Sequence, residues 1–321
     1  MITKLPHNMK CILCNSDNFN IISKKLRNNI KRNVVECSSC KLVSLENPTK
    51  NIIDYDKNYR KLHSPIIGKQ LSAKEFFDYE LPFQKSRIKR IKSMLNQNLD
   101  VLEIGCSTGH FLYSIKDDVK SLTGIELDKK YAEFARNVSN FTIYDEPIEK
   151  INFNGKKFDI IFLFQVFEHI DNPQNFLHEI KKHLKDSGII YLEVPNIDDA
   201  LYSIYNLNSY KEFYFRLPHV YYYSSFTLEK MLEFCGFVGK IGYHQDFSFF
   251  NHLHWLQNGT PQKNQKIATE ITSWYGNNDV QLPTSQVVKN WLSKIDQEYK
   301  KILCENGISE ILSFTGKKNN P

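Results

Sequence analysis

The sequence predicts an α/β fold in which a doubly wound, mostly parallel sheet follows a small cysteine-containing unit and precedes a helical extension. Three observations predict this arrangement. From about residue 99 onward, short apolar runs typical of buried strands alternate with helical patterns. The first of these strands runs into a glycine-containing turn, and two Cys-x-x-Cys pairs lie near the start of the chain. The composition, with 41% hydrophobic and 24% charged residues, is typical of a globular protein.

The expected elements alternate along the middle of the chain. Strands are expected at 100–104, 121–126, 140–144, 158–164 and 189–194, with an edge strand at 238–243. Helices are expected at 128–137, 173–183 and 226–234, and the fixed φ of Pro173 suits the first turn of the second one. After about residue 245 there is no strand alternation, so we expect helices such as 287–304 and frayed residues at 316–321.

Four parts of the chain follow from these patterns. They are a zinc-ribbon-like cysteine unit at 1–48, a helical connector at 49–98, the sheet domain at 99–245, and a helical C-terminal extension at 246–321.

The charge and hydropathy of the chain limit the kinds of partner that are expected. A net charge of +6, from 42 basic and 36 acidic residues, suits an anionic ligand or RNA, and it is equally compatible with solubility alone. The longest apolar stretches, such as 160–167, are too short to cross a bilayer. Residues 1–10 contain no apolar signal-peptide core, so a cytoplasmic protein is expected.

The turn after the first strand has the residues that a close approach to a ligand needs. The strand ends at Gly105, the chain turns through Cys106 to Thr108, and a helix starts near Gly109. Small residues let the backbone approach a ligand, and the N–H groups at a helix N-terminus bind anions. Glu126 ends the next strand, where an acid can bind ribose hydroxyls. A nicotinamide site would need Gly-x-Gly-x-x-Gly, which this turn lacks.

This segment resembles the first motif of the class I methyltransferases, acid-x-Gly-x-Gly-x-Gly. Glu103, Gly105 and Gly109 match that motif, and Ser107, which is also small, replaces the middle glycine. The resemblance implies a Rossmann-like domain that binds S-adenosylmethionine. It also implies that Glu103 orders the ammonium end of the methionine, and that Gly105 and Gly109, with Cys106 between them, make room for the cofactor.

Two later blocks extend the resemblance. Residues 158–173 and 184–196 resemble the fourth and fifth strands of the same family, so that the match covers about 99–243. It implies further cofactor contacts at the carboxyl ends of the strands, where open α/β sheets bind ligands. These contacts are Glu126 on the ribose diol, Asp145 (or the equally close Glu146) near the adenine amino group, and Phe164 and Gln165 beside the methionine part.

The paired cysteines predict a structural zinc site. Cys11-x-x-Cys14 and Cys37-x-x-Cys40 can bring four thiolates to one tetrahedral ion, which leaves no open position for catalysis. No thioredoxin-like pattern surrounds either pair, so a redox dithiol is less well supported. Zinc ribbons of this layout resemble those of two kinds of methyltransferase, which modify sugars and surface polysaccharides or ribosomal RNA.

Two segments after the fifth strand indicate the acceptor. Residues 217–228 resemble a segment of methyltransferases from sugar and polysaccharide pathways, and residues 251–261 resemble a narrower signature of the same group. The resemblance implies methyl transfer to a small acceptor, a hydroxyl of a nucleotide-linked sugar or glycan precursor in surface-polysaccharide biosynthesis. Aromatic faces stack on sugar carbons while polar groups bind hydroxyls. The expected substrate contacts are Tyr221, Tyr222, Asn251 and His252, for which packing under the C-terminal helices is the alternative.

Two other functions stay open at this point. One is RNA methylation, with the zinc ribbon holding RNA, and the other is a non-catalytic zinc-ribbon binding protein on a methyltransferase fold. The absence of a dense basic face and the 251–261 segment favour a small acceptor over nucleic acid.

Two histidines are candidates for the catalytic base. A sugar hydroxyl is a poor nucleophile, and the ordinary pKa of histidine lies near working pH. His219 follows the fifth strand in the segment expected to wall the acceptor site, and His169 follows the fourth strand. We favour His219 as the base, with His169 as the second candidate. Shaping the loop, for His169, and substrate binding without proton transfer, for His219, are the alternatives.

Overall fold

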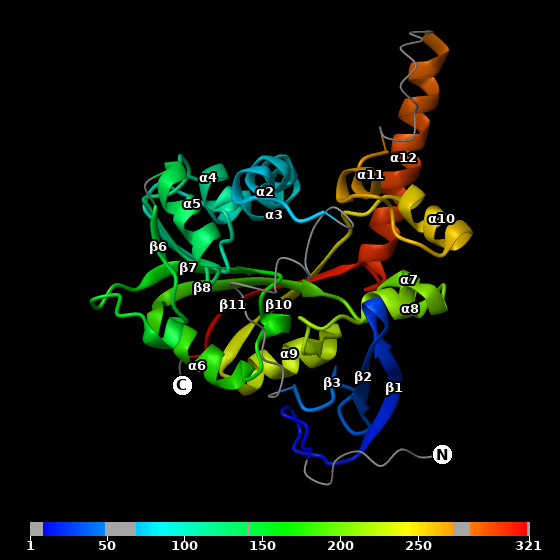
Figure 1. Ribbon diagram of the computed structural model, residues 1–321. Helices are drawn as coiled ribbons and strands as arrows, with labels where there is room; N and C mark the ends of the chain where they lie inside the picture. The colour runs from blue at the N-terminus through cyan, green and yellow to red at the C-terminus, as the bar shows by residue number, and fades with distance from the viewer. Residues whose placement is uncertain (1–8, 49–68, 140, 272–282, 320–321) are drawn as a thin grey trace.

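The computed structural model describes residues 9–48, 69–139, 141–271 and 283–319, which form two sheets (Figure 1). The larger sheet contains, in spatial order, β10 (Phe237–His244), β11 (Ile311–Lys318), β8 (Leu184–Pro195), β7 (Phe158–Phe164), β4 (Asp100–Ile104), β5 (Ser121–Ile125) and β6 (Thr142–Tyr144). The smaller sheet contains β1 (Phe19–Leu26), β2 (Ile30–Cys37), β3 (Val43–Leu45) and β9 (Tyr221–Tyr222).

The larger sheet is doubly wound. The strands β8, β7, β4, β5 and β6 run parallel. Strand order reverses between β4 and β7, so this is the switch point at which such sheets bind ligands. The helices α4 (His110–Ser114) and α5 (Lys129–Ser139) lie on one face, and α6 (Pro173–His183) and α9 (Ser225–Phe234) lie on the other (Figure 1). These features confirm the predicted fold class.

The predicted strands of the sheet domain are present, with shifted ends. The edge strand expected at 238–243 is β10. β8 begins at Leu184 rather than at residue 189, because Leu184 already pairs with Phe158 ahead of an irregularity in the register.

The last strand corrects the expectation for the C-terminal tail. β11 lies antiparallel between β8 and β10, where Phe314 pairs with Leu192 on one side and Ile241 on the other. The expected helical and frayed tail is therefore wrong for residues 311–318. Consecutive residues of β11, including Leu312 and Ser313, are buried because both faces of the strand are covered. Such a strand lacks the alternation by which a half-exposed strand is recognised.

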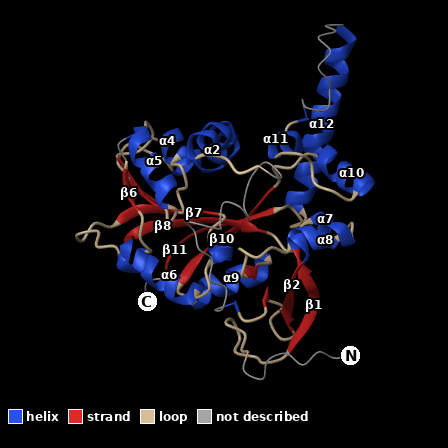
Figure 2. Ribbon diagram, in the orientation of Figure 1, coloured by secondary structure: helices blue, strands red, loops and turns tan. Residues whose placement is uncertain are grey.

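The remaining helices surround the sheet. The connector contains α2 (Ala73–Glu80) and α3 (Gln84–Ile91), while residues 49–68 lie outside the described part of the chain. The other helices are α7 (Ala200–Ser203), α8 (Asn208–Tyr214), α10 (Phe249–Asn258), α11 (Gln265–Thr269) and α12 (Pro283–Glu305). The last three agree with the predicted helical extension, and Figure 2 shows them grouped together, apart from α4 and α5.

The cysteine unit shares its sheet with the larger domain. β3 pairs with β9, a segment of the sheet domain, through Val43 opposite Tyr222 and Ser44 opposite Tyr221. The guanidinium of Arg27 also lies 3.4 Å from the ring centroid of Phe213. The region expected as a separate unit at 1–48 is thus joined to the segment that follows the fifth parallel strand.

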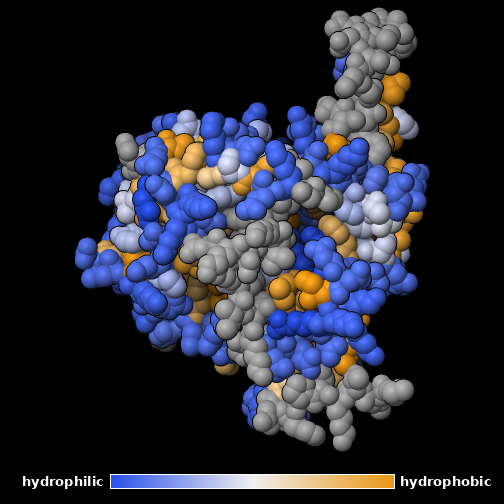
Figure 3. Space-filling view, in the orientation of Figure 1, coloured by the Kyte–Doolittle hydropathy of each residue, from blue (hydrophilic) through white to orange (hydrophobic). Residues whose placement is uncertain are grey.

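The visible face of the described surface is mostly hydrophilic, with scattered hydrophobic patches (Figure 3). Among the described residues, no helix has both the length and the apolar character that crossing a membrane requires.

Candidate cofactor site and catalytic cluster

The glycine turn lies between β4 and α4. Gly105 and Gly109 have φ values of 77° and 76°, in the left-handed region that glycine adopts at little cost. Ser107 has a φ of 51°. A Cβ atom on Gly105 would lie 2.4 Å from Cγ2 of Val166, so no larger residue fits there without a shift. The turn therefore brings bare backbone to the carboxyl edge of the sheet.

Glu126 binds the backbone of this turn. Its Oε2 atom accepts a hydrogen bond from the Ser107 N–H at 2.9 Å, and its Oε1 atom accepts one from the Asp128 N–H at 2.7 Å. A carboxylate oxygen can accept more than one hydrogen bond, so these contacts leave capacity for the hydroxyl groups of a ligand.

Glu103 is an incompletely satisfied acid at this edge. Its side chain is buried, with 3% of the residue exposed, and its Oε2 atom has no hydrogen-bond partner among the described residues. Burial raises the pKa of Glu103 to about 8, against an opposing effect of Arg87. A ligand cation beside this group would stabilise its charged form. The buried carboxyl group of Glu103 therefore fits the ammonium end of S-adenosylmethionine.

The other predicted cofactor residues lie at the ends of neighbouring strands. Phe164 ends β7, and Gln165 follows it with a φ of 56°. Cys106 is buried within the glycine turn. Asp145 follows β6 and forms an ion pair with Arg136 at 3.2 Å. The sheet thus brings these positions to one edge, while their contacts with a cofactor stay predictions.

His169 and His219, which lie far apart in the sequence, meet beyond the end of β7. Their ring centroids are 4.8 Å apart, and the rings are nearly perpendicular, at 85°. The Nε2 atom of each histidine lies 3.8 Å from Oε1 of Glu168. The structure therefore combines both candidate bases with a buried carboxyl group.

The surroundings of this cluster disfavour charge on its members. Burial raises the pKa of Glu168 to about 8, and burial with the nearby Arg216 lowers the pKa of His169 to about 3. The Nε atom of Arg216 donates a hydrogen bond to Nε2 of His219 at 2.8 Å. His169 Nδ1 lies 2.8 Å from the carbonyl oxygen of Pro218, which leads us to assign the proton to Nδ1.

Main-chain hydrogen bonds connect this cluster to the cysteine sheet. Leu45 N–H, in β3, donates to the carbonyl oxygen of Val220 at 2.9 Å, and Val220 N–H donates to that of Glu168 at 2.9 Å. Two predicted substrate contacts lie beside this link. The Tyr222 hydroxyl bonds to the backbone of Arg216, and the Tyr221 hydroxyl donates to a carbonyl oxygen of the loop before α6. Both tyrosines are buried and serve packing here, so their substrate contacts stay a prediction.

Asn251 and His252 lie in α10, with only 2% and 1% of each residue exposed. His252 Nδ1 is 2.7 Å from the hydroxyl of Tyr299 in α12, a contact that joins two helices of the C-terminal extension. This contact of His252 does not involve His169 or His219. A role of Asn251 and His252 in substrate binding likewise stays a prediction.

The four paired cysteines converge. Their sulfur atoms all lie within 4.8 Å of one another, with Cys11 to Cys40 at 3.4 Å and Cys14 to Cys37 at 3.5 Å. Tetrahedral zinc with Zn–S bonds of about 2.3 Å would hold sulfur atoms about 3.8 Å apart. The donor set and its spacing therefore fit a zinc ion.

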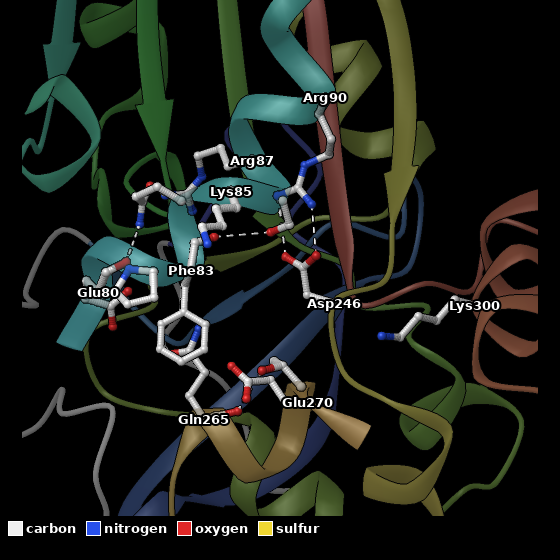
Figure 4. Close-up of a pocket in the computed structure, with 13 residues that line it drawn as sticks. Glu80, Phe83, Lys85, Arg87, Arg90, Asp246, Gln265, Glu270 and Lys300 are labelled. Atoms are coloured by element: carbon white, nitrogen blue, oxygen red, sulfur yellow. Dashed lines mark hydrogen bonds and ion pairs between the residues drawn. The ribbon is translucent and has the colours of Figure 1, made fainter. Parts of the chain in front are cut away.

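A polar cavity of about 280 Å³ opens beside the connector helices (Figure 4). Its lining comes from α2, α3, the segment between them, the end of β10, α11 and α12. The lining residues are Glu80, Pro82, Phe83, Gln84, Lys85, Ser86, Arg87, Arg90, Asp246, Gln265, Thr269, Glu270 and Lys300. Arg90 faces Asp246 across this cavity, with Nη1 2.9 Å from Oδ1 (Figure 4). The guanidinium of Arg87 lies 4.1 Å from the ring centroid of Phe164, so the cavity adjoins the end of β7.

Comparison with known proteins identifies the family. A family model described as a methyltransferase domain matches residues 76–239, slightly more than half of the chain. The chain belongs to this methyltransferase family.

Individual relatives of the methyltransferase cover less of it. A tRNA U34 carboxymethyltransferase from Nautilia profundicola is 32% identical over 115 residues, or 34% of this chain and 38% of that protein. A ubiquinone biosynthesis O-methyltransferase from Rickettsia bellii is 27% identical over 116 residues, or 34% of this chain and 48% of that protein. The chain spans about half the length, or less, of these curated relatives. A crystal structure of a SAM-dependent methyltransferase from Archaeoglobus fulgidus aligns with a TM-score of 0.48 at 19% identity, over 76% of this chain and 99% of that one.

Sequence reasoning missed three charged residues of the methyltransferase that meet at this edge. Glu193, in β8, is completely buried, and its carboxylate pairs with Arg87 and Arg90 of α3 at 3.2 and 3.3 Å. An acid within the apolar run of β8 was the available signal, because a buried charge needs a partner. The basic run at 85–92 contains Ile88 and Ile91 at helical spacing, a pattern that predicts a solvated helix face. Instead, Arg87 and Arg90 of this run pair with buried or half-buried acids.

Proposed function

We propose that this chain transfers the methyl group of S-adenosylmethionine to a hydroxyl of a nucleotide-linked sugar or a related glycan precursor. One observation carries the cofactor part of the proposal. Glu103 is a buried carboxyl group with one oxygen unpartnered among the described residues; it lies on β4, two residues before Gly105, and Glu126 follows the neighbouring strand β5. A bound ammonium group would pair with the carboxylate of Glu103, and a ribose diol would donate hydrogen bonds to the carboxylate of Glu126.

The chemistry needs little more than alignment. The acceptor oxygen attacks the sulfonium methyl in line, so that an O–C bond forms, the C–S bond breaks, and S-adenosylhomocysteine leaves. Gly105 and Gly109 admit the cofactor to the edge of the sheet, and Phe164 and Gln165 would flank its methionine part. Holding the two reactants in line supplies a large part of the rate.

The polar cavity supports a small, hydrophilic acceptor. Charged and amide side chains dominate its lining, and the ring of Phe83 offers an apolar face of the kind that stacks on sugar carbons (Figure 4). Arg87, which lines the cavity, contacts the ring of Phe164 at the end of β7. This contact supports a location of the cavity beside the strand end where the methyl group would arrive.

We propose His219 as the group that takes the hydroxyl proton, with His169 as the second candidate. Arg216 occupies Nε2 of His219, so this guanidinium must move aside before that nitrogen can act as a base. A low pKa limits His169 as a base, because little of its proton affinity survives burial.

We further propose that the four cysteines hold a structural zinc ion. Four thiolates complete its coordination, so its contribution is to fold the cysteine sheet, which in turn supports the segment bearing His219.

Calorimetry with S-adenosylmethionine tests the cofactor site. Wild-type protein should bind it, and Glu126→Ala should weaken binding by about 1.5–3 kcal/mol, because a hydrogen bond to a charged group is lost. Glu149→Ala, an exposed acid on the same sheet domain, is the matched control and should change nothing. Intact wild-type protein that fails to bind would end the proposal.

Transfer of labelled methyl groups tests the acceptor. A panel of nucleotide sugars should include a substrate, whereas structured RNA should not be methylated. RNA is the rival acceptor because some relatives are named tRNA U34 carboxymethyltransferases. Against it, Arg87 and Arg90 of the basic run are neutralised by Glu193 and Asp246. Methylation of RNA that persists at physiological salt would reverse this choice, since non-specific binding weakens with salt.

A further inference from the structure

The cluster beyond β7 has the arrangement of a cation site. Oε1 of Glu168 lies 3.8 Å from Nε2 of His169 and 3.8 Å from Nε2 of His219, and these three atoms all lie within 4.8 Å of one another. The distances exceed those of direct hydrogen bonds, so the three atoms face one another across a gap. An ion at their centre would lie close to the metal–ligand distances of about 2.0–2.2 Å that imidazole and carboxylate adopt.

The carboxyl group of Glu168 points to a missing partner. The residue is 1% exposed, and neither of its carboxylate oxygens has a hydrogen-bond partner among the described residues. Buried carboxylates are otherwise paired, hydrogen-bonded or metal-bound, because an unsatisfied one is costly.

The histidine tautomer also suits metal ligation. With Nδ1–H of His169 donated to the carbonyl oxygen of Pro218 at 2.8 Å, Nε2 carries no proton and lies 3.8 Å from Oε1 of Glu168. Ligating histidines usually donate their other N–H to a carbonyl or carboxylate in this way, which fixes the ring. Both Nε2 atoms lie 3.8 Å from the same carboxylate oxygen of Glu168.

One charged group competes for this position. Arg216 donates its Nε–H to Nε2 of His219 at 2.8 Å, so its guanidinium supplies the positive charge nearest the cluster. Its backbone is held by the Tyr222 hydroxyl, whereas its long side chain is only partly buried and can rotate away.

We propose that Glu168, His169 and His219 bind a divalent transition-metal ion, with Arg216 leaving His219 as the ion enters. Two imidazole nitrogens and one carboxylate oxygen suit Mn²⁺, Fe²⁺ or Zn²⁺, and three protein ligands leave positions open for an acceptor. The chemical role rests on the proposed function: a cation here would lower the pKa of an acceptor hydroxyl, with the proton passing to solvent. His219 would then act as a ligand instead of as the base.

Titration with Mn²⁺ tests this site, and binding is measured as the loss of the electron paramagnetic resonance signal of the free ion. The full-length protein should first receive one equivalent of zinc per chain, which the four thiolates take up because they select zinc, so that the cysteine site is closed and the histidine site stays available to Mn²⁺. We expect one Mn²⁺ per chain, and a loss of affinity of at least about 10- to 100-fold in Glu168→Gln and in His219→Ala. Arg216→Gln should bind Mn²⁺ more tightly, because the competing cation is gone.

Two controls separate this site from others. His183→Ala removes a histidine outside the cluster that also contacts a carboxylate, Glu179 at 3.3 Å on α6, and should leave Mn²⁺ binding unchanged. Broadening of the His169 and His219 ring signals by Mn²⁺ in wild-type protein locates the ion even if a variant does not fold.

Folded wild-type protein that binds S-adenosylmethionine but no Mn²⁺ would overturn the inference, as would Mn²⁺ binding that leaves both ring signals sharp. Full methyl transfer in the presence of a chelator would refute the role in catalysis while leaving the proposed function intact. Absence of cofactor binding would count against the proposed function alone.

Discussion

Replacing Gly105 by alanine tests whether the turn at the end of β4 is kept open by glycine. Two separate costs are expected. A φ of 77° is unfavourable for alanine by about 1–2 kcal/mol. The new Cβ would also lie 2.4 Å from Cγ2 of Val166, and such overpacking costs about 1–3 kcal/mol. The free energy of unfolding of Gly105→Ala should therefore fall by about 2–5 kcal/mol.

A double-mutant cycle separates the two costs. Val166→Ala removes Cγ2, and the Val166 Cβ atom, at 3.7 Å, is an ordinary contact. In that background Gly105→Ala should cost only the backbone part, so that the coupling free energy is about 1–3 kcal/mol. Urea unfolding of the four proteins measures it, and calorimetry with S-adenosylmethionine shows whether cofactor affinity recovers. Gly105→Ala costing the same in both backgrounds would refute the steric reasoning.

Three further predictions concern the other parts of the site. Elemental analysis should find one structural zinc per chain, and Cys11→Ser should lose it. Loss of the zinc should speed amide hydrogen exchange at residues 220–222, which bond to β3. Unchanged exchange at these residues would show that the cysteine sheet does not stabilise the segment bearing His219. His219→Gln should lower turnover by about 10²- to 10⁴-fold while calorimetry shows intact cofactor binding, and near-normal turnover would exclude it from the chemistry. Glu103 has a raised pKa, so the folded state binds more protons than the unfolded state between the ordinary pKa of glutamate and about 8. The stability of the cofactor-free protein should accordingly fall as pH rises through that window, and urea unfolding should show a shallower fall in Glu103→Gln.

Local features made much of this site predictable. Apolar runs ending in glycine turns locate parallel strands, and the carboxyl ends of such strands share one edge. For that reason Glu103, Gly105 and Glu126 could be placed together before any coordinates. The two Cys-x-x-Cys pairs were equally readable, because four sulfur atoms at this spacing have few other arrangements.

Contacts between residues distant in the chain could not be predicted from the sequence in the same way. Arg87 lies on a helix whose composition indicated a solvated face, and only the packing of α3 over β7 and β8 turns it toward Glu193. The substrate contacts predicted for the tyrosines of β9 stay a prediction, and nothing in their own segment revealed that β3 would pair with them. His252 likewise contacts Tyr299, a residue far along the chain, through the packing of α10 on α12.

By itself, then, the sequence determined a doubly wound sheet, its glycine turn and the cysteine cluster, since each depends on hydrophobic period, backbone freedom or ligand spacing within a short segment. The tertiary structure alone decided three things: that β11 inserts between β8 and β10, that the cysteine sheet continues into β9, and that Glu168, His169 and His219 converge. Each of these depends on contacts between segments distant in the chain. Such contacts are set by which buried surfaces fit together, and no local pattern of residues encodes that fit.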